Sequence, residues 1–238
     1  MHSFTYNGIN SRTYCELYVS GGGTFNAPER DIESIPVPGR DGELTVDNGR
    51  FKNITVEYDA WIANDFAHNA AKARAWLCSQ RGYKRLEDDY NPYEYRMARF
   101  VGGVEFEAFI SNGDFLAGST TLKFDCMPQR FLKSGEEEIT SNNSPIHIIN
   151  PTFFDSQPIV TITGSGSGTL TINSNAIAIS DIDGYVTLNT NIQRAYKGTI
   201  AKDSTITGAY PIFTPGENSV EFSGGITGVS IIPRWWTV

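Results

Sequence analysis

Short runs that alternate apolar and polar residues, separated by glycine-containing turns, fill the last third of this chain. Residues 158–163 and 169–173 flank a Gly-Ser-Gly-Ser-Gly segment, and residues 176–182 and 185–189 flank an Asp-Gly pair. Because side chains alternate between the two faces of a strand, such runs with turn residues between them predict hairpins. The pattern continues toward the end of the chain with no helical period. We therefore predict a β-sandwich for this part of the chain.

A drop in charge density divides the 238 residues into two parts. Residues 1–138 contain 15 Lys and Arg and 21 Asp and Glu, whereas residues 139–238 contain only 4 and 6. Residues 132–145 are rich in Ser, Asn and Glu and are expected to form exposed connecting chain. We predict an N-terminal domain over residues 1–133 and a C-terminal domain over residues 134–238.

The first part combines strand patterns with one helix. Asn-Gly at 7–8 predicts a tight hairpin turn, and Asn-Gly at 112–113 predicts a second reversal of the chain. Asn64 is a suitable helix N-cap and Gly82 a suitable stop. Between them, apolar residues recur at helical spacing on one face: Phe66, Ala70, Ala73 and Leu77. The fold class predicted for the whole chain is mainly β, with one α-helix in the N-terminal domain.

Residues 27–43 contain three prolines, which rules out a helix or a central strand because proline lacks a backbone donor. We predict a long extended arm. Its apolar side chains still need burial, so we expect residues 28–43 to lie across a neighbouring subunit. The residues predicted to make contacts between subunits or with a partner are Ile35, Val37, Gly39, Arg40, Asp41 and Gly42.

Charge and composition exclude several classes of protein. The net charge is −8, whereas a protein that grips the phosphate backbone carries a basic face, so no sequence-specific nucleic acid is expected as a partner. No apolar run is long enough to span a bilayer, and residues 1–10 lack the apolar core of an export signal, so we expect no membrane insertion. Three widely spaced cysteines, an odd number, favour reduced, buried thiols: Cys15, Cys78 and Cys126.

No motif in the sequence predicts catalysis. The three histidines form no zinc pattern, no Gly-x-Ser-x-Gly elbow occurs, and the glycines at 164–168 are not followed by the lysine of a phosphate loop. Glu105 and Glu107 lie two apart on a predicted strand and share a face, which is not the opposed pair that glycoside hydrolysis requires. We predict no catalytic, cofactor-binding or metal-binding residues, and we expect the protein not to be an enzyme.

Several segments together resemble one family, the distal tail proteins of long non-contractile-tailed bacteriophages and prophages. The segments that carry the resemblance occur in order along the whole chain: FTYNG at 4–8, VPGRDG at 37–42, GY at 82–83, PYEYR at 92–96, CMPQRF at 126–131, NPT at 150–152, FSG at 222–224 and PRWWTV at 233–238.

The resemblance implies a structural hub of the phage tail tip, or baseplate. In that family the N-terminal domain forms a hexameric ring and the C-terminal domain is a galectin-like β-sandwich on its outside. The ring joins the tail tube protein to the tail-associated lysin or tip protein, with the tape measure and a receptor-binding protein as further partners. It leaves a passage for DNA. The implied location is the virion tail tip, with the host cytoplasm as the site of assembly.

If such a ring surrounds a DNA path, its opening must not hold phosphates tightly. We therefore expect acidic side chains to face the opening, either Glu105 and Glu107 or the run at residues 87–89. The alternative is that these carboxylates lie on the outer rim.

Two other functions remain open. The first is a carbohydrate-binding β-sandwich that recognises host cell-wall sugars, although the sequence lacks the His-x-Asn-x-Arg pattern of sugar-binding galectins. An enzyme acting on wall polysaccharide is the more distant alternative. A discrete hexamer would favour the hub, and binding to a glycan array would favour the carbohydrate-binding protein.

Overall fold

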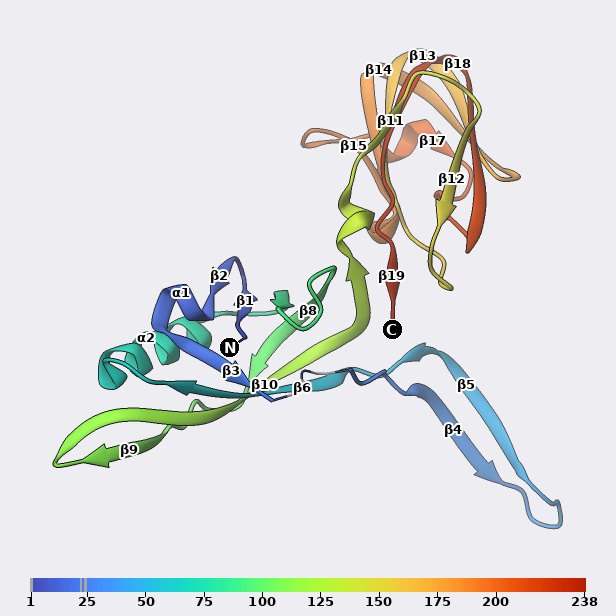
Figure 1. Ribbon diagram of the computed structural model, residues 1–238. Coiled ribbons are helices and arrows are strands. Elements are labelled where there is room, and N and C mark those ends of the chain that lie inside the picture. The colour runs from blue at the N-terminus through green and yellow to red at the C-terminus, as the bar shows by residue number, and fades with distance from the viewer. Residues whose placement is uncertain (1, 22, 24) are drawn as a thin grey trace. The chain divides into compact units, whose positions relative to one another are not determined.

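The computed structural model describes residues 2–21, 23 and 25–238, and the chain forms two compact units (Figure 1). Unit 1 comprises Met1–Arg130 with Val238, and unit 2 comprises Phe131–Thr237. Each unit has its own hydrophobic core. Neither α-helix among the described residues is long and apolar enough to cross a bilayer.

Unit 1 is built on an antiparallel sheet whose strands follow the order β2-β1-β7-β8-β10-β6-β3, with β9 beside β10. The strands are β1 (Phe4–Tyr6), β2 (Ile9–Asn10), β3 (Leu17–Ser20), β6 (Ile54–Ile62), β7 (Lys84–Asp88), β8 (Glu94–Val101), β9 (Glu107–Ser111) and β10 (Asp114–Leu132). The turn predicted at Asn7-Gly8 joins β1 to β2, and both residues have the positive φ that such a turn needs.

Helix α2 (Phe66–Ser79) is the helix that the sequence predicts, and the apolar face that we expected is buried together with Trp76. Its N-cap residue is Asp65 rather than Asn64, and the helix ends three residues before Gly82. A second helix, α1 (Ser11–Cys15), was not predicted. The prediction of one helix was wrong because α1 has only five residues, too few to show a period, and is held by its cap at Asn10.

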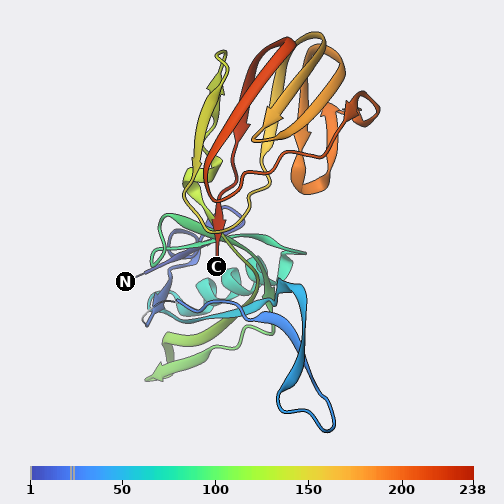
Figure 2. The same cartoon turned by 90° about the vertical axis from the view of Figure 1, so that its right-hand side faces the viewer.

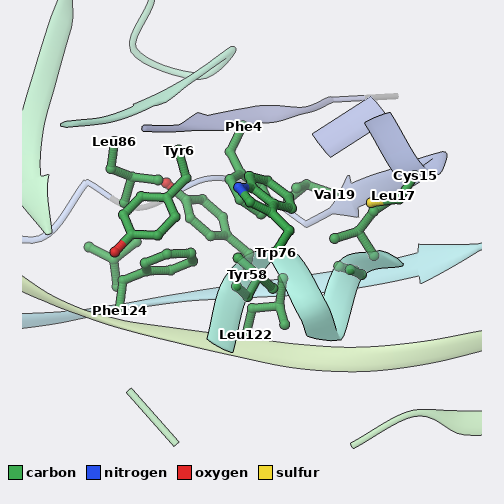
Figure 3. Close-up of a cluster of buried hydrophobic side chains, with 14 of the residues drawn as sticks. Phe4, Tyr6, Cys15, Leu17, Val19, Tyr58, Trp76, Leu86, Leu122 and Phe124 are labelled. Atoms are coloured by element: carbon green, nitrogen blue, oxygen red, sulfur yellow. The ribbon is translucent and has the colours of Figure 1, made fainter. Parts of the chain in front are cut away.

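The core of unit 1 is an aromatic cluster (Figure 3). The Phe4 ring stacks on Tyr58 with centroids 5.3 Å apart and on Trp76 at 5.6 Å. Phe124 meets the Phe4 and Tyr6 rings edge-on at 5.6 and 5.1 Å. Edge-to-face and offset pairs of this kind are the favoured arrangements of aromatic rings. The cluster therefore ties β1, β6, β10 and α2 into one body.

Unit 2 is a curled antiparallel sheet with the strand order β11-β18-β13-β14-β15-β16, with β12 beside β18 and β17 beside β14. The strands are β11 (Ile139–Ser141), β12 (Ile146–Asn150), β13 (Ile159–Ile172), β14 (Asn175–Asn189), β15 (Arg194–Lys197), β16 (Ile200–Ala201), β17 (Ile206–Thr207) and β18 (Gly216–Ile232). Unit 2 consists almost entirely of β-strands. The mainly β fold class predicted from the sequence is therefore confirmed.

The hairpins predicted within unit 2 were wrong in detail. The Gly-Ser-Gly-Ser-Gly segment is not a turn but a bulged bend inside the single strand β13, and Asp183-Gly184 lies inside β14 opposite it. Glycine is required because the backbones approach closely: a Cβ on Gly225 would lie 1.8 Å from the carbonyl oxygen of Ser165. These bends let three long strands curl round one core.

The segment expected to be exposed connecting chain is mostly part of unit 2. Residues Lys133–Glu136 form a short 3₁₀ helix, and β11 pairs with β18, placing Ile139 opposite Ile231. The sequence suggested a linker because polar residues dominate it, yet every second residue of β11 can still face the unit 2 core.

Candidate interaction site

The extended arm predicted from the sequence forms one half of a β-hairpin. Strand β4 (Arg30–Pro36) pairs with β5 (Glu43–Phe51) in a separate two-stranded sheet that extends away from the main sheet of unit 1 (Figures 1 and 2). The exclusion of a helix and of a central strand was therefore correct, but β5 was not predicted. We name residues 30–51 the arm hairpin. Apart from the partly buried Asp31 and Phe51, its side chains are exposed.

One face of the arm hairpin is apolar. In its register Ile35 lies opposite Leu44 and Glu33 opposite Val46, so these four side chains share a face. The exposed fractions of Ile35, Val46 and Leu44 are 39, 40 and 46%. An isolated two-stranded hairpin is marginally stable in water. A hairpin that keeps this much apolar surface exposed is therefore suited to docking on another chain.

The tip carries the remaining predicted contact residues. Val37 accepts a hydrogen bond from the amide of Arg40 at 3.2 Å, with Pro38 and Gly39 between them. Gly39 has a φ of 79°, so proline followed by glycine fits a type II turn. Arg40, Asp41 and Gly42 follow this turn and are exposed. The structure thus brings all six predicted contact residues to one end of one hairpin.

Ion pairs hold the two strands of the arm hairpin together. Asp31 accepts a hydrogen bond from the Arg50 Nε at 2.7 Å, and this contact lowers the pKa of the Asp31 carboxyl. Nearer the body, the Arg30 guanidinium lies over the Phe51 ring, 4.7 Å from its centroid. The amide of Lys52 donates to the carbonyl of Glu29 at 2.9 Å, which closes the base of the hairpin. These contacts keep the two strands of the arm hairpin paired.

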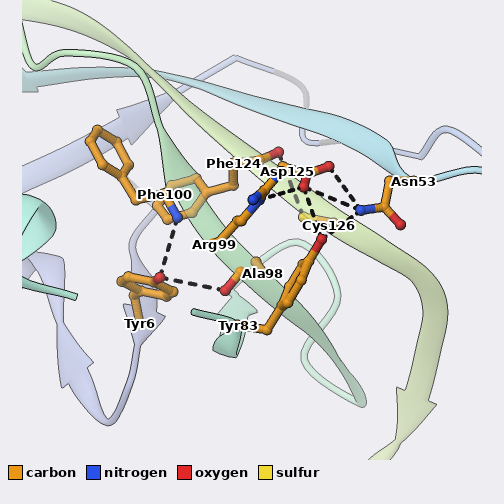
Figure 4. A network of polar contacts seen from close by, with 9 residues as sticks. All are labelled: Tyr6, Asn53, Tyr83, Ala98, Arg99, Phe100, Phe124, Asp125 and Cys126. Carbon is orange, nitrogen blue, oxygen red and sulfur yellow. Dashed lines mark hydrogen bonds and ion pairs between the residues drawn. The ribbon is translucent and has the colours of Figure 1, made fainter. Parts of the chain in front are cut away.

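A polar network anchors the arm hairpin to unit 1 (Figure 4). Two residues after the end of β5, the Asn53 side-chain amide donates to Tyr83 Oη at 2.7 Å and to Asp125 Oδ1 at 3.1 Å. Arg99 Nε donates to Asp125 at 2.7 Å. Burial raises the pKa of Asp125, but the hydrogen bonds from Arg99, Asn53 and Tyr83 outweigh it, so the pKa is lowered. Asp125 therefore remains ionised. Its hydrogen bonds fix the point where the arm hairpin joins the main sheet of unit 1.

The acidic residues that we expected to face a ring opening lie in different surroundings. Residues 87–89 are not a solvated loop: Glu87 pairs with Arg85, Asp88 accepts from Tyr58 at 2.7 Å and Asp89 accepts from Ser3. Glu87 and Asp88 end β7, which lies in the middle of the sheet between β1 and β8.

Glu105 and Glu107 do not lie on the same strand. Glu107 begins β9, but Glu105 precedes that strand, so the two do not share a strand face as predicted. The sequence suggested one strand because the run around Phe106 alternates.

No three metal-binding side chains converge in the described part of the chain. Burial raises the pKa of the Cys15 thiol to about 11 and that of the Cys126 thiol to about 12, which leaves both protonated and unreactive at neutral pH. Cys78 is a free thiol but is exposed, so the prediction of a buried thiol was wrong for this cysteine.

Comparison with known proteins finds a likeness of fold. No family model matches the chain, and no curated protein matches it. Among solved structures, it is similar to the crystal structure of the SPP1 Dit (gp 19.1) protein, described as a paradigm of the hub adsorption apparatus in phages that infect Gram-positive bacteria. The likeness covers 100% of both chains with a TM-score of 0.75 at 13% identity. The chain therefore has the fold of a phage Dit hub protein along its whole length, as the resemblance in its sequence predicted.

Proposed function

We propose that this protein is a structural hub at the tip of a phage tail and not an enzyme. The observation that carries the proposal is the fold shared over the full length of both chains with a Dit hub protein. A coincidental likeness confined to one β-sandwich would cover one unit only, because sandwiches recur in unrelated proteins. Here the likeness extends over both units.

The proposed assembly is a hexameric ring of unit 1, within the domain that we assign to residues 1–133. The arm hairpin supports self-assembly because it has an apolar face and pairs with no other strand of its own chain among the described residues. A contact between two different surfaces of identical chains closes into a ring when its rotation fits. Residues 134–238 would form the galectin-like domain outside the ring.

The proposed partners are the tail tube protein on one side and the tail-associated lysin or tip protein on the other. The tape measure and a receptor-binding protein are further candidates, and the hub would assemble in the host cytoplasm before it becomes part of the virion. With a net charge of −8 in each chain, the ring would repel DNA rather than retain it in the passage. Glu105 and Glu107 are the carboxylates proposed to face the opening.

Immunogold electron microscopy of virions from the encoding phage or prophage tests the proposal. Antibodies against the full chain should label the tail tip, at the end away from the capsid. Labelling of the capsid, or a virion without this protein, would contradict it. The carbohydrate-binding alternative is tested separately by applying the full chain to a glycan array that includes cell-wall polysaccharides, where the hub proposal expects no binding.

A further inference from the structure

Basic residues gather on helix α2 and just after it, in a chain that is otherwise strongly acidic. Residues 66–86 contain five Lys and Arg and no Asp or Glu. Removing these five positive charges from the net charge of −8 leaves −13 for the other residues. A local run of the minority sign creates a surface potential opposite to that of the rest of the chain. This segment therefore attracts groups that the remaining surface repels.

Four of the five cations lie on or next to the helix side of unit 1, and we name them the basic patch: Lys72, Arg74, Arg81 and Lys84. Arg74 is exposed on α2, which lies beside α1 in Figure 1, and Arg81 is exposed just after the helix. Lys84 begins β7 and shares a strand face with Leu86, which is buried in the same core as α2. The fifth cation, Arg85, points to the other face of the sheet.

The basic patch is not neutralised by its own chain. None of its four residues makes an ion pair with any residue that the structure describes, and Lys72 lies instead over the Tyr14 ring, 5.1 Å from its centroid. The acid that precedes α2, Asp65, lies at the opposite end of the helix from Arg81.

The helix itself does not need these cations. Positive charge stabilises a helix when it lies in the last turn, beside the negative end of the dipole. The last turn of α2 contains no basic residue, so Lys72 and Arg74 are not placed for that purpose. With neither ion pairs nor the dipole to account for it, the basic patch is suited to an acidic partner.

The size of the basic patch indicates which kind of acidic partner fits. The 14 residues of α2 span about 21 Å at 1.5 Å per residue. A long polyanion such as duplex DNA would extend beyond this length onto the acidic remainder of the chain and be repelled there. A short acidic segment meets only the basic patch, where arginine can bind a carboxylate through two parallel hydrogen bonds.

We propose that the basic patch binds a short segment, rich in Asp and Glu, of another tail protein. Arg74 and Arg81 pair with the carboxylates of that segment, and Lys72 and Lys84 add to the attraction. The inference rests on the proposed hub function, in which neighbouring tail proteins are joined, and it specifies the chemistry of one such contact.

The exposed thiol of Cys78 reports on the potential at the basic patch, because it lies one helical turn after Arg74. Its rates of reaction with the doubly anionic Ellman reagent and with neutral dithiodipyridine are measured on the full chain, in which Cys15 and Cys126 are buried. The ratio of the two rates cancels the reactivity of the thiol itself. Arg74→Gln should lower this ratio about threefold at low salt and leave it unchanged at about 1 M salt. A ratio that Arg74→Gln does not change at low salt would overturn the basic patch.

Binding is tested with a fluorescent peptide of eight glutamates, titrated with the full chain at low salt and followed by fluorescence anisotropy. Arg74→Glu should raise the dissociation constant about tenfold. The matched control is Lys123→Glu, which makes the same change in net charge on the opposite face of the sheet, where Lys123 pairs with Glu57, and should change the constant by less than about twofold.

Equal effects of the two variants, no binding of the peptide, or tighter binding of a short DNA duplex would each overturn this inference and leave the hub proposal standing. Absence of the protein from virions would overturn the hub proposal, and with it the tail partner, even if the peptide binds.

Discussion

Removing the Phe124 ring should destabilise unit 1 severely. Phe124 is 0% exposed, and its ring meets four others edge-on, with centroids 5.1–5.9 Å away: Phe4, Tyr6, Tyr58 and Phe100. Truncating a fully buried phenylalanine costs about 3–5 kcal/mol through lost burial and the cavity left behind. Four aromatic neighbours from three strands, β1, β6 and β8, cannot all move in to fill that cavity, so we expect Phe124→Ala to fall in the upper half of this range.

The matched control is Phe109→Ala, the same truncation in the same unit. Phe109 is 64% exposed, so its removal should change the free energy of unfolding by no more than about 0.5 kcal/mol. Urea unfolding followed by hydrogen exchange of peptides from β6 and α2 reports on unit 1 separately from unit 2. Equal urea midpoints for the two variants would refute the assignment of Phe124 to the core and of Phe109 to a free surface.

Three further predictions concern unit 2, the anchor and the arm. Gly225→Ala should destabilise unit 2 by about 1–3 kcal/mol or more, because the new methyl group would meet the Ser165 carbonyl; hydrogen exchange of β13 peptides measures this. Asp125→Asn should remove the acid sensitivity of unit 1 that comes from the Arg99 contact. Because the pKa of Asp125 is lowered in the folded state, its stabilisation is present above the unfolded value of about 3.9 and is lost as the pH falls through the lowered value. Leu44→Asp should abolish oligomers without changing the unfolding of unit 1, as measured by analytical ultracentrifugation and urea titration.

Controls separate these effects from general damage. Gly103→Ala should be tolerated, since a Cβ there meets nothing within 4 Å. Lys123→Gln removes an exposed ion pair with Glu57 and should leave the pH profile of unfolding unchanged. Oligomers of unchanged mass with Leu44→Asp, or an acid profile of Asp125→Asn that matches the parent chain, would each contradict the corresponding role.

Local signals in the sequence predicted local structure well. The helix over 66–79 follows from its apolar spacing, and the reversals at Asn7-Gly8 and Asn112-Gly113 follow from the positive φ that these residues accept. Prolines correctly excluded a central strand from the arm. The partner strand β5 was missed, although Leu44, Thr45 and Val46 alternate as strand residues do.

What the sequence could not predict depends on long-range contacts. A Gly-Ser-Gly-Ser-Gly run is typical of a turn, and only the close approach of Gly225 to Ser165 shows it to be a bend inside β13. Likewise, Asp88 belongs to a run of acids that resembles a solvated loop until Tyr58, thirty positions away, is seen to donate to it. The exposure of the apolar side chains that flank the Asn112-Gly113 turn was not predicted, because exposure cannot be read from composition.

Native mass spectrometry of the full chain, with and without the arm hairpin, tests the central claim most directly. In the comparison variant, an Asn-Gly pair replaces residues 30–51 and joins Glu29 to Lys52, whose backbones are already hydrogen-bonded at 2.9 Å. None of the core residues of unit 1 is removed. We predict a discrete assembly of about six chain masses for the full chain and a folded monomer for the variant. An assembly of the same mass from the variant, or a full chain that remains monomeric at every concentration, would contradict the account.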